Sequence, residues 1–281
     1  MEEFDVPVSG GSLRVCRWPG DGPVVIAAHG ITANALTFAP VADKARVQLV
    51  APDLRGRARS NQLPGPYGMA AHAADLIAVA DHLGVDRVVL AGHSMGGFVV
   101  AATAVMYPER VSGVLLIDGG VALPVPPNAD VDEVLQAVIG PAIARLGMTF
   151  ADEQAYLDFF RAHPGLRDGW SPAVEAYVKR DLAGTRSSCS LEAVRADATD
   201  TLIDRVTVDA VHHLAVPARL LWAQRGLQNE DQGMYAESQL TGLNFPVEFV
   251  PEVNHYSILF DPHAAGLVAD RLFSLAANAG R

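Results

Sequence analysis

Ser94 lies in the pentapeptide Gly92-His93-Ser94-Met95-Gly96, directly after the apolar run 88–91 and directly before a second apolar run, 97–102. This pattern predicts a tight turn from a strand into a helix. The turn forces the serine into a strained backbone conformation, and only residues without bulk fit two positions before and after it. A serine presented in this way is suited to attack a carbonyl carbon, so we predict that Ser94 is a nucleophile.

A serine nucleophile needs a base to take its proton. His255 follows the last apolar run, 247–250, and precedes the final predicted helix. In a parallel sheet the loops that follow the strands share one edge, and Ser94 lies at that edge. We therefore predict that His255 is the base. The poorer candidates, which fall in predicted helices or in the middle of the chain, are His72, His82, His163, His212, His213 and His263.

The base in turn needs an acid that fixes its tautomer. Asp118 ends the apolar run 111–117, at the same edge of the predicted sheet. The alternative acids are Glu230 and Asp231, which follow the run 219–223 at a longer distance and are also suited to the first turn of a helix. We favour Asp118 and keep Glu230 and Asp231 as alternatives.

Attack on a carbonyl creates an oxyanion that must meet preorganised donors. His29-Gly30-Ile31 follows the apolar run 24–28, and Met95 opens the predicted helix after Ser94. We predict that the backbone N–H groups of Ile31 and Met95 form this oxyanion hole, and the helix N-terminus favours the negative charge. His29 is then expected to be an architectural hydrogen-bonding residue.

Apolar strands alternate with helices along most of the chain, which predicts an α/β fold with a mostly parallel sheet flanked by helices. The segments 4–8 and 13–18 flank a Gly-Gly pair and predict an antiparallel hairpin. This alternation of strands and helices ends at the proline-dense segment 123–128. From there to about residue 213 only helix signals are found, such as N-caps at Thr149 and Ser171. We expect a core of residues 1–121 and 214–281, and a helical cap of residues 122–213.

The chain of 281 residues has a net charge of −11, and its 21 Lys and Arg residues form no basic cluster. This argues against nucleic acid or an anionic membrane as a partner and favours a small, uncharged or weakly polar substrate. A homodimer is compatible with the chain. Two distant cysteines and an acidic N-terminal segment favour two reduced thiols and a cytoplasmic location. No motif for a metal or a phosphate-bearing cofactor is present, so no cofactor is expected.

Four motifs together resemble the α/β-hydrolase superfamily: His29-Gly30 after a strand, the segment 53–60, the turn at Ser94 and the late His255. The resemblance implies an eight-stranded, mostly parallel sheet, with Ser94 after strand five, His255 after strand eight and the helical insertion as a cap over the site. Two departures stand out. Ala58 replaces a glycine usual in this superfamily, and the usual aspartate after strand seven is missing near Gly226. Some members carry the acid after strand six, where Asp118 lies.

The resemblance does not fix the reaction. Cleavage of an ester, thioester or lactone through an acyl-serine is the leading hypothesis. Hydrolysis of a carbon–carbon bond of the meta-cleavage type, and a non-catalytic ligand receptor, are the alternatives. Asp53 and Arg55 are expected to hold loops together. The cap is expected to supply a substrate pocket, while its aromatic-rich faces are read as core: Phe150, Tyr156, Leu157, Phe159, Phe160, Trp170 and Tyr177.

Overall fold

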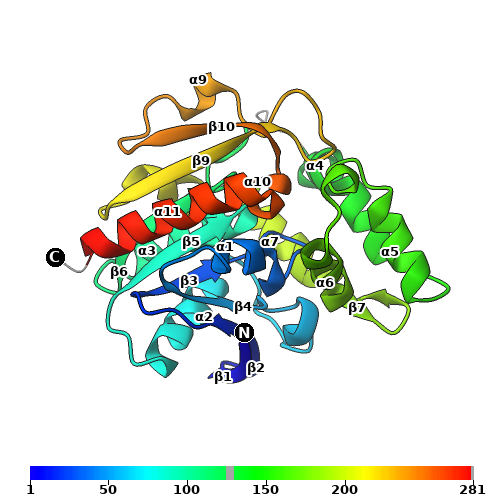
Figure 1. Cartoon of the computed structure of the whole chain (residues 1–281), viewed down its shortest axis with the longest axis horizontal. Coiled ribbons are helices and arrows are strands. Elements are labelled where there is room, and N and C mark those ends of the chain that lie inside the picture. Colours follow the sequence, from blue (N-terminus) through cyan, green and yellow to red (C-terminus); the bar gives the residue numbers. More distant parts are fainter. Residues whose placement is uncertain (125–129, 280–281) are drawn as a thin grey trace.

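Eight strands form one sheet in the computed structural model, which describes residues 1–124 and 130–279 (Figure 1). The strands are β1 (Glu2–Val8), β2 (Gly11–Trp18), β3 (Val24–Ala28), β4 (Gln48–Pro52), β5 (Val88–His93), β6 (Val111–Ile117), β9 (Ala218–Arg225) and β10 (Val247–Asn254). Their order is β1-β2-β4-β3-β5-β6-β9-β10. β2 pairs antiparallel with β1 and β4, and all later pairs are parallel. The predicted hairpin and the mostly parallel sheet are confirmed.

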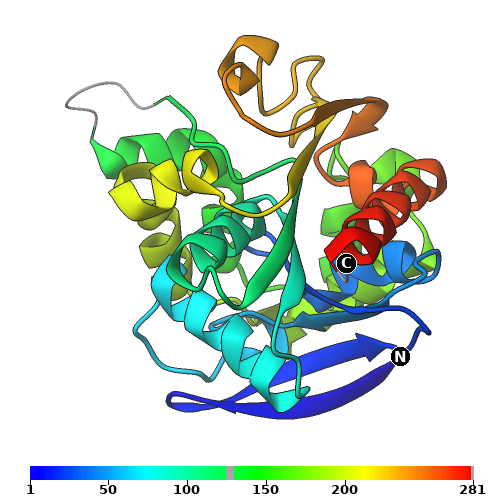
Figure 2. The ribbon, with the colours of Figure 1, turned by 90° about the vertical axis from the view of Figure 1, so that its left-hand side faces the viewer.

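The centre of the sheet is buried on both faces. Every residue of β5 and β6 is buried, as expected for strands that are apolar at nearly every position and covered by helices on each side. The helices α2 (Met69–His82) and α3 (Met95–Met106) pack on one face. The helices α1 (Ala39–Ala42), α10 (Ser257–Phe260) and α11 (Pro262–Ala279) pack on the other. Figure 2 shows α11 and α2 on opposite sides of the sheet.

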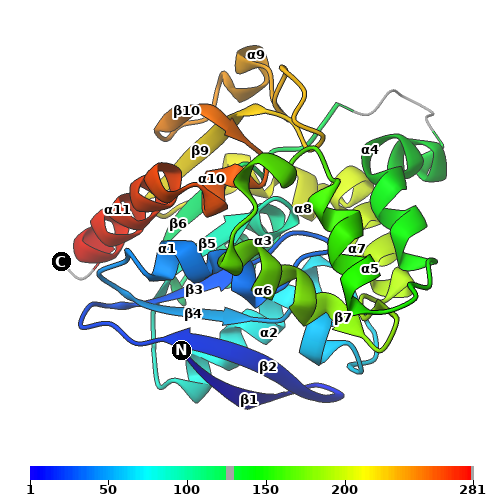
Figure 3. The same cartoon turned by 45° about the vertical axis from the view of Figure 1, so that its right-hand side comes forward.

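A helix-rich region separates β6 from β9 and gathers at one end of the sheet (Figure 3). Its helices are α4 (Val131–Leu146), α5 (Glu153–Arg161), α6 (Pro172–Asp181), α7 (Leu191–Ile203) and α8 (Arg205–Asp209). A further short helix, α9 (Glu237–Leu240), follows β9. The expected absence of strands between residues 131 and 213 is wrong, because β7 (Leu182–Ala183) and β8 (Arg186–Ser187) form a small antiparallel hairpin. Strands of two residues are too short to show any periodicity. Of the proline-dense segment 123–128, residues 125–128 lie outside the described part.

Two helices of this region, α5 and α6, test the predicted N-cap residues. Ser171 accepts a hydrogen bond from the N–H of Val174 at 3.3 Å, so this predicted N-cap is confirmed. The prediction of an N-cap at Thr149 is wrong. Asp152 caps α5 instead, by accepting the N–H of Ala155 at 2.8 Å. The hydroxyl of Thr149 accepts a hydrogen bond from Arg186 of the β7–β8 hairpin, a contact that the local sequence does not reveal.

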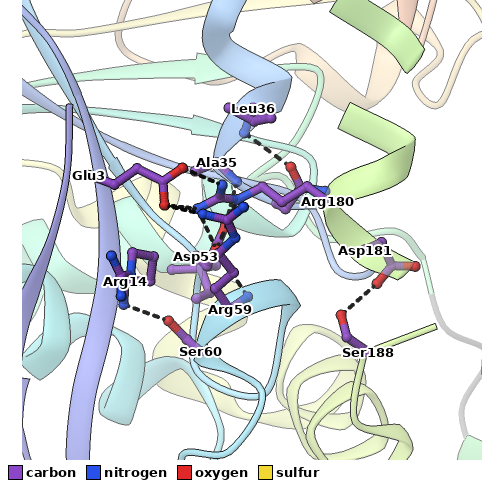
Figure 4. A network of polar contacts seen from close by, with 12 residues as sticks. Glu3, Arg14, Ala35, Leu36, Asp53, Arg59, Ser60, Arg180, Asp181 and Ser188 are labelled. Carbon is purple, nitrogen blue, oxygen red and sulfur yellow. Dashed lines mark hydrogen bonds and ion pairs between the residues drawn. The ribbon is translucent and has the colours of Figure 1, made fainter. Parts of the chain in front are cut away.

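A buried ion pair attaches the helix-rich region to the sheet (Figure 4). Arg180 of α6 donates from Nε to both carboxylate oxygens of Asp53, each at 3.0 Å, and from Nη1 to Glu3 at 2.9 Å. Asp53 also accepts the backbone N–H groups of Ala35 and Arg59. Asp53 therefore joins loops of the core to the helix-rich region, in the structural role expected of it.

Among the described residues, none of the helices has the length and apolarity needed to cross a membrane. Cys16 and Cys189 are both buried and unpaired. Burial raises the pKa of Cys16 to about 12 and that of Cys189 to about 11, so both thiols stay protonated at neutral pH.

Candidate functional site

Ser94 occupies the single residue between β5 and α3, with φ 57° and ψ −124°. This conformation is strained for a residue with a side chain and occurs where a fold presents a group for function. A Cβ atom on Gly92 would lie 2.0 Å from the carbonyl oxygen of Gly96, and one on Gly96 would lie 2.0 Å from that of Ala28. The two glycines are thus required by space, as the sequence predicted.

Asp118 follows the last residue of β6 and also has a positive φ, 45°. Its Oδ1 accepts the backbone N–H of Ala223 on β9 at 3.0 Å. A Cβ atom on the next residue, Gly119, would lie 2.0 Å from the carbonyl oxygen of Ser94. The backbones that carry Ser94 and Asp118 are therefore in direct contact.

His255 lies in the loop between β10 and α10, and its Nδ1 is 2.6 Å from Oδ2 of Asp118. Both side chains are buried. A carboxylate can only accept, so Nδ1 carries the proton and Nε2 is left as a base. The structure thus brings Asp118 and His255 together, and Asp118 lines the same pocket as Ser94.

The alternative acids lie elsewhere. Glu230 accepts the backbone N–H of Gln228 at 2.8 Å, and Asp231 is exposed, 3.9 Å from Arg225. Neither carboxylate contacts His255, whose Nδ1 is occupied by Asp118. The structure therefore favours Asp118 over both alternatives.

His93, the neighbour of Ser94, contacts the loop that carries His255, which the sequence did not predict. Its Nε2 lies 2.8 Å from the backbone oxygen of His255, and the two rings pack with their centroids 4.6 Å apart. A carbonyl oxygen can only accept, so Nε2 of His93 is the donor. Burial, together with the nearby His255, lowers the pKa of His93 well below its usual range and keeps the ring neutral. The signal available in the sequence was a histidine directly before Ser94.

Asn254 shapes the loop that carries His255. Its Oδ1 accepts the N–H groups of Tyr256 and Ser257, and its Nδ2 donates to the backbone oxygen of Gly165 in the helix-rich region. The side chain therefore fixes the turn on which His255 stands.

Ile31 and Met95, the predicted oxyanion-hole residues, line the same pocket as Ser94. Met95 is the first residue of α3, so its N–H group lies at the positive end of that helix. His29, two residues before Ile31, accepts the N–H of Leu54 at Nε2 and donates from Nδ1 to Gly30. Burial lowers the pKa of His29 to about 3. His29 is thus a neutral, structural residue, as expected.

Ala58 stands where the superfamily usually has glycine, and its φ is 42°. This value lies in the left-handed region, which glycine adopts without strain. The departure noted in the sequence therefore affects only the local turn, which keeps the conformation that a glycine would have.

Ser94 lines a pocket with a volume of about 100 Å³. The helix-rich region supplies part of its wall through α4 and α7. Asp118, already bonded to His255, is the one charged side chain among the described lining residues. The apolar members of the wall are Ile31, Met95, Phe98, Val121, Leu123, Val138, Ile139, Ala198, Leu202, Leu227 and Met234.

The aromatic-rich faces of the helix-rich region pack on one another and on Tyr256 and Phe260 rather than on this pocket. Tyr156 of α5 and Tyr177 of α6 are buried in a separate cluster, and Phe159 and Phe160 pack against it. None of the seven side chains predicted to be cap core, all of them in the described part, lines the pocket. This agrees with their interpretation as core.

Comparisons with known proteins agree with this architecture. The model of the alpha/beta hydrolase fold family matches residues 23–201, more than half of the chain. An uncharacterised Mycobacterium tuberculosis protein, Rv2715, is 36% identical over 115 residues, which are 39% of this chain and 33% of that protein. The lipase LipV of the same species is 33% identical over 129 residues, which are 45% of this chain and 48% of LipV. These matches thus span between a third and a half of the relatives' lengths.

The match to solved structures extends over the whole fold. The crystal structure of E-2-(acetamidomethylene)succinate hydrolase superposes with a TM-score of 0.78 and 21% identity, and the match covers 98% of each chain. At this identity the likeness shows the fold and no particular substrate. The eight-stranded sheet, the serine at its strand-to-helix turn and the family match together lead to one conclusion: the chain belongs to the α/β-hydrolase fold family.

Proposed function

We propose that this hydrolase is a serine enzyme that cleaves a carboxylic ester, thioester or lactone of a small, uncharged substrate. One observation carries the proposal. The strained Ser94 lines one pocket with Asp118, and Asp118 is paired with the buried His255. This arrangement supplies a nucleophile, a base and an orienting acid in one place.

The reaction begins when Ser94 Oγ passes its proton to Nε2 of His255 and attacks the carbonyl carbon. The carbonyl π bond opens, and its oxygen becomes an oxyanion facing the N–H groups of Ile31 and Met95. When the intermediate collapses, the bond to the leaving group breaks and His255 returns the proton to that group. Water then repeats the sequence on the acyl-serine and releases the acid. Asp118 stabilises the protonated imidazole in both halves.

The pocket supports an uncharged substrate. Its wall is mostly apolar, and Asp118, the one charged side chain among the described lining residues, is already bonded to His255. A charged group entering the pocket would therefore lose its hydration without gaining a free partner. The cap residues that face the substrate in this proposal are Val138 and Ile139 of α4 and Ala198, Thr201 and Leu202 of α7.

We also propose a cytoplasmic location and a small molecule as the physiological partner. The two buried, unpaired thiols support a reducing compartment. The absence of a basic run in the sequence and the net charge of −11 support a partner that is not a polyanion.

A fluorophosphonate probe tests the proposal, because it reacts only with an activated serine. The protein should be labelled and should hydrolyse p-nitrophenyl acetate. Ser94→Ala should abolish both and leave the circular dichroism spectrum unchanged, whereas Ser112→Ala, at the second residue of β6, should retain both. Failure of the unmodified protein to react with the probe would favour a ligand receptor. Residual turnover above about one per cent in Ser94→Ala would move the nucleophile elsewhere.

A further inference from the structure

Arg57 is fully buried directly behind the two residues that supply the proposed oxyanion hole. Its Nε donates to the backbone oxygen of Ile31 at 2.9 Å, and its Nη2 lies 3.9 Å from the sulfur of Met95. One rigid, planar guanidinium therefore contacts both residues of the proposed oxyanion hole.

The charge of Arg57 is neutralised from the cap. Nη1 of Arg57 pairs with Oδ2 of Asp197 on α7, and neither side chain is exposed. Asp197 also accepts the N–H of Gly68 at 2.6 Å and a hydrogen bond from Nε2 of His72 at 2.8 Å. Burial raises the pKa of Asp197, but the facing His72 and Arg57 outweigh it and lower the pKa to about 2. The aspartate is thus ionised at neutral pH.

A buried ion pair is costly to desolvate and is weak evidence for stability by itself. Here it connects three parts of the site. Asp197 directly precedes Ala198, and α7 presents Ala198, Thr201 and Leu202 to the pocket. The helix that shapes the pocket is therefore tied through one arginine to the residues that meet the oxyanion.

We propose that Arg57 is a positioning residue for the oxyanion hole and that Asp197 of the cap holds it in place. The inference rests on the proposed function, since it assigns a role in that reaction. Arg57 itself adds little charge to the site because Asp197 compensates it. Its effect is to fix the backbone of Ile31 and the first residue of α3 where the negative charge develops.

The chain offers a matched control in Arg55, a second buried arginine of the same loop. Its Nε and Nη2 bind Asp75 at 3.0 and 2.7 Å, and its Nη1 donates to the backbone oxygens of Ser9 and Pro64. These contacts include neither Ile31 nor Met95. Substituting either arginine by lysine keeps the charge and removes the planar fork, so the two variants lose similar chemistry at different places.

The test is a comparison of Arg57→Lys and Arg55→Lys on p-nitrophenyl butyrate, with thermal unfolding as the check of folding. Arg57→Lys should lower kcat about 10- to 100-fold and change KM less than about threefold, because the oxyanion forms only after binding. Arg55→Lys should stay within about threefold of the unmodified enzyme in both constants. Asp197→Asn, which keeps an acceptor for Gly68, should lower kcat in the same direction as Arg57→Lys.

An alkyl boronic acid provides a second readout, because its tetrahedral adduct with Ser94 places an oxygen in the same hole. Its inhibition constant should rise in Arg57→Lys by the factor by which kcat/KM falls. Equal losses in the two lysine variants, or a folded Arg57→Lys with kcat within threefold of the unmodified enzyme, would overturn the inference and leave the proposed function standing. An unmodified protein that neither hydrolyses the ester nor reacts with a fluorophosphonate would overturn both.

Discussion

Nδ1 of His255 donates to Oδ2 of Asp118 at 2.6 Å although 137 residues separate the two in the sequence. The other carboxylate oxygen of Asp118 is held by the backbone of Ala223, so the acid cannot rotate away. The pair therefore fixes which nitrogen of His255 is protonated and which is free to accept a proton.

Asp118→Asn tests this relationship. The amide would stabilise the protonated imidazole poorly and would favour the wrong tautomer, so kcat for p-nitrophenyl acetate should fall by a factor on the order of 10⁴. Glu230→Gln is the matched control and should retain activity within about twofold. A large loss in Glu230→Gln with none in Asp118→Asn would reassign the acid.

His93→Phe tests the residue that supports the His255 backbone. Phenylalanine keeps a ring against His255 but has no donor, so the carbonyl oxygen of His255 loses its hydrogen bond. An unmet buried acceptor costs about 1–3 kcal/mol, and we expect kcat to fall about tenfold as the loop shifts. Steady-state kinetics measures this. The control is His82→Phe, because His82 is exposed. Equal kcat values in the two variants would show that His93 does not support His255.

His29→Gln tests a stability effect of pH. His29 has its pKa lowered by burial to about 3, against about 6.5 when exposed. A depressed pKa in the folded state means that its contribution to stability is complete above about pH 6.5 and is lost as the pH falls towards 3. The advantage of the unmodified protein over His29→Gln should therefore shrink by up to about 1.4 kcal/mol for each pH unit below 6.5. Urea unfolding at pH 7, 6 and 5 measures this, and a constant difference would contradict it.

Two esters of matched length test the uncharged pocket. p-Nitrophenyl butyrate and mono-p-nitrophenyl succinate carry acyl chains of the same number of carbons, and only the succinate has a terminal carboxylate. We expect kcat/KM to favour the butyrate by about 100-fold or more, because the pocket would leave a carboxylate unpaired. Equal kcat/KM values for the two esters would mean that a positively charged group that is not among the described lining residues binds the carboxylate of the succinate.

Much of the fold was predictable because its strands are apolar at almost every position. The runs 24–28 and 111–117 coincide with β3 and β6. Ser94 was predictable for a steric reason, since glycines at positions 92 and 96 are needed by the turn. Asp118 was open to doubt because two other carboxylates followed a strand, and only the contact with His255 separates them.

Other features depend on contacts between residues far apart in the sequence. The strands of the β7–β8 hairpin are too short to show an alternating hydrophobic pattern. The predicted N-cap at Thr149 was wrong because the hydroxyl of Thr149 accepts a hydrogen bond from Arg186 instead. The pair of Arg57 and Asp197 joins positions 140 residues apart. An arginine or an aspartate at either position would ordinarily be expected on the surface. The sequence therefore could not predict that Arg57 and Asp197 form a buried ion pair.

The close approach of backbones around Gly92 and Gly96 has an evolutionary consequence. A methyl group at either position would push apart β3, β5 and α3 and so displace Ser94. Pocket side chains on α4 and α7, in contrast, can be exchanged without disturbing that crossing. We therefore expect related proteins to vary at the pocket positions of α4 and α7 and to retain glycine at positions 92 and 96.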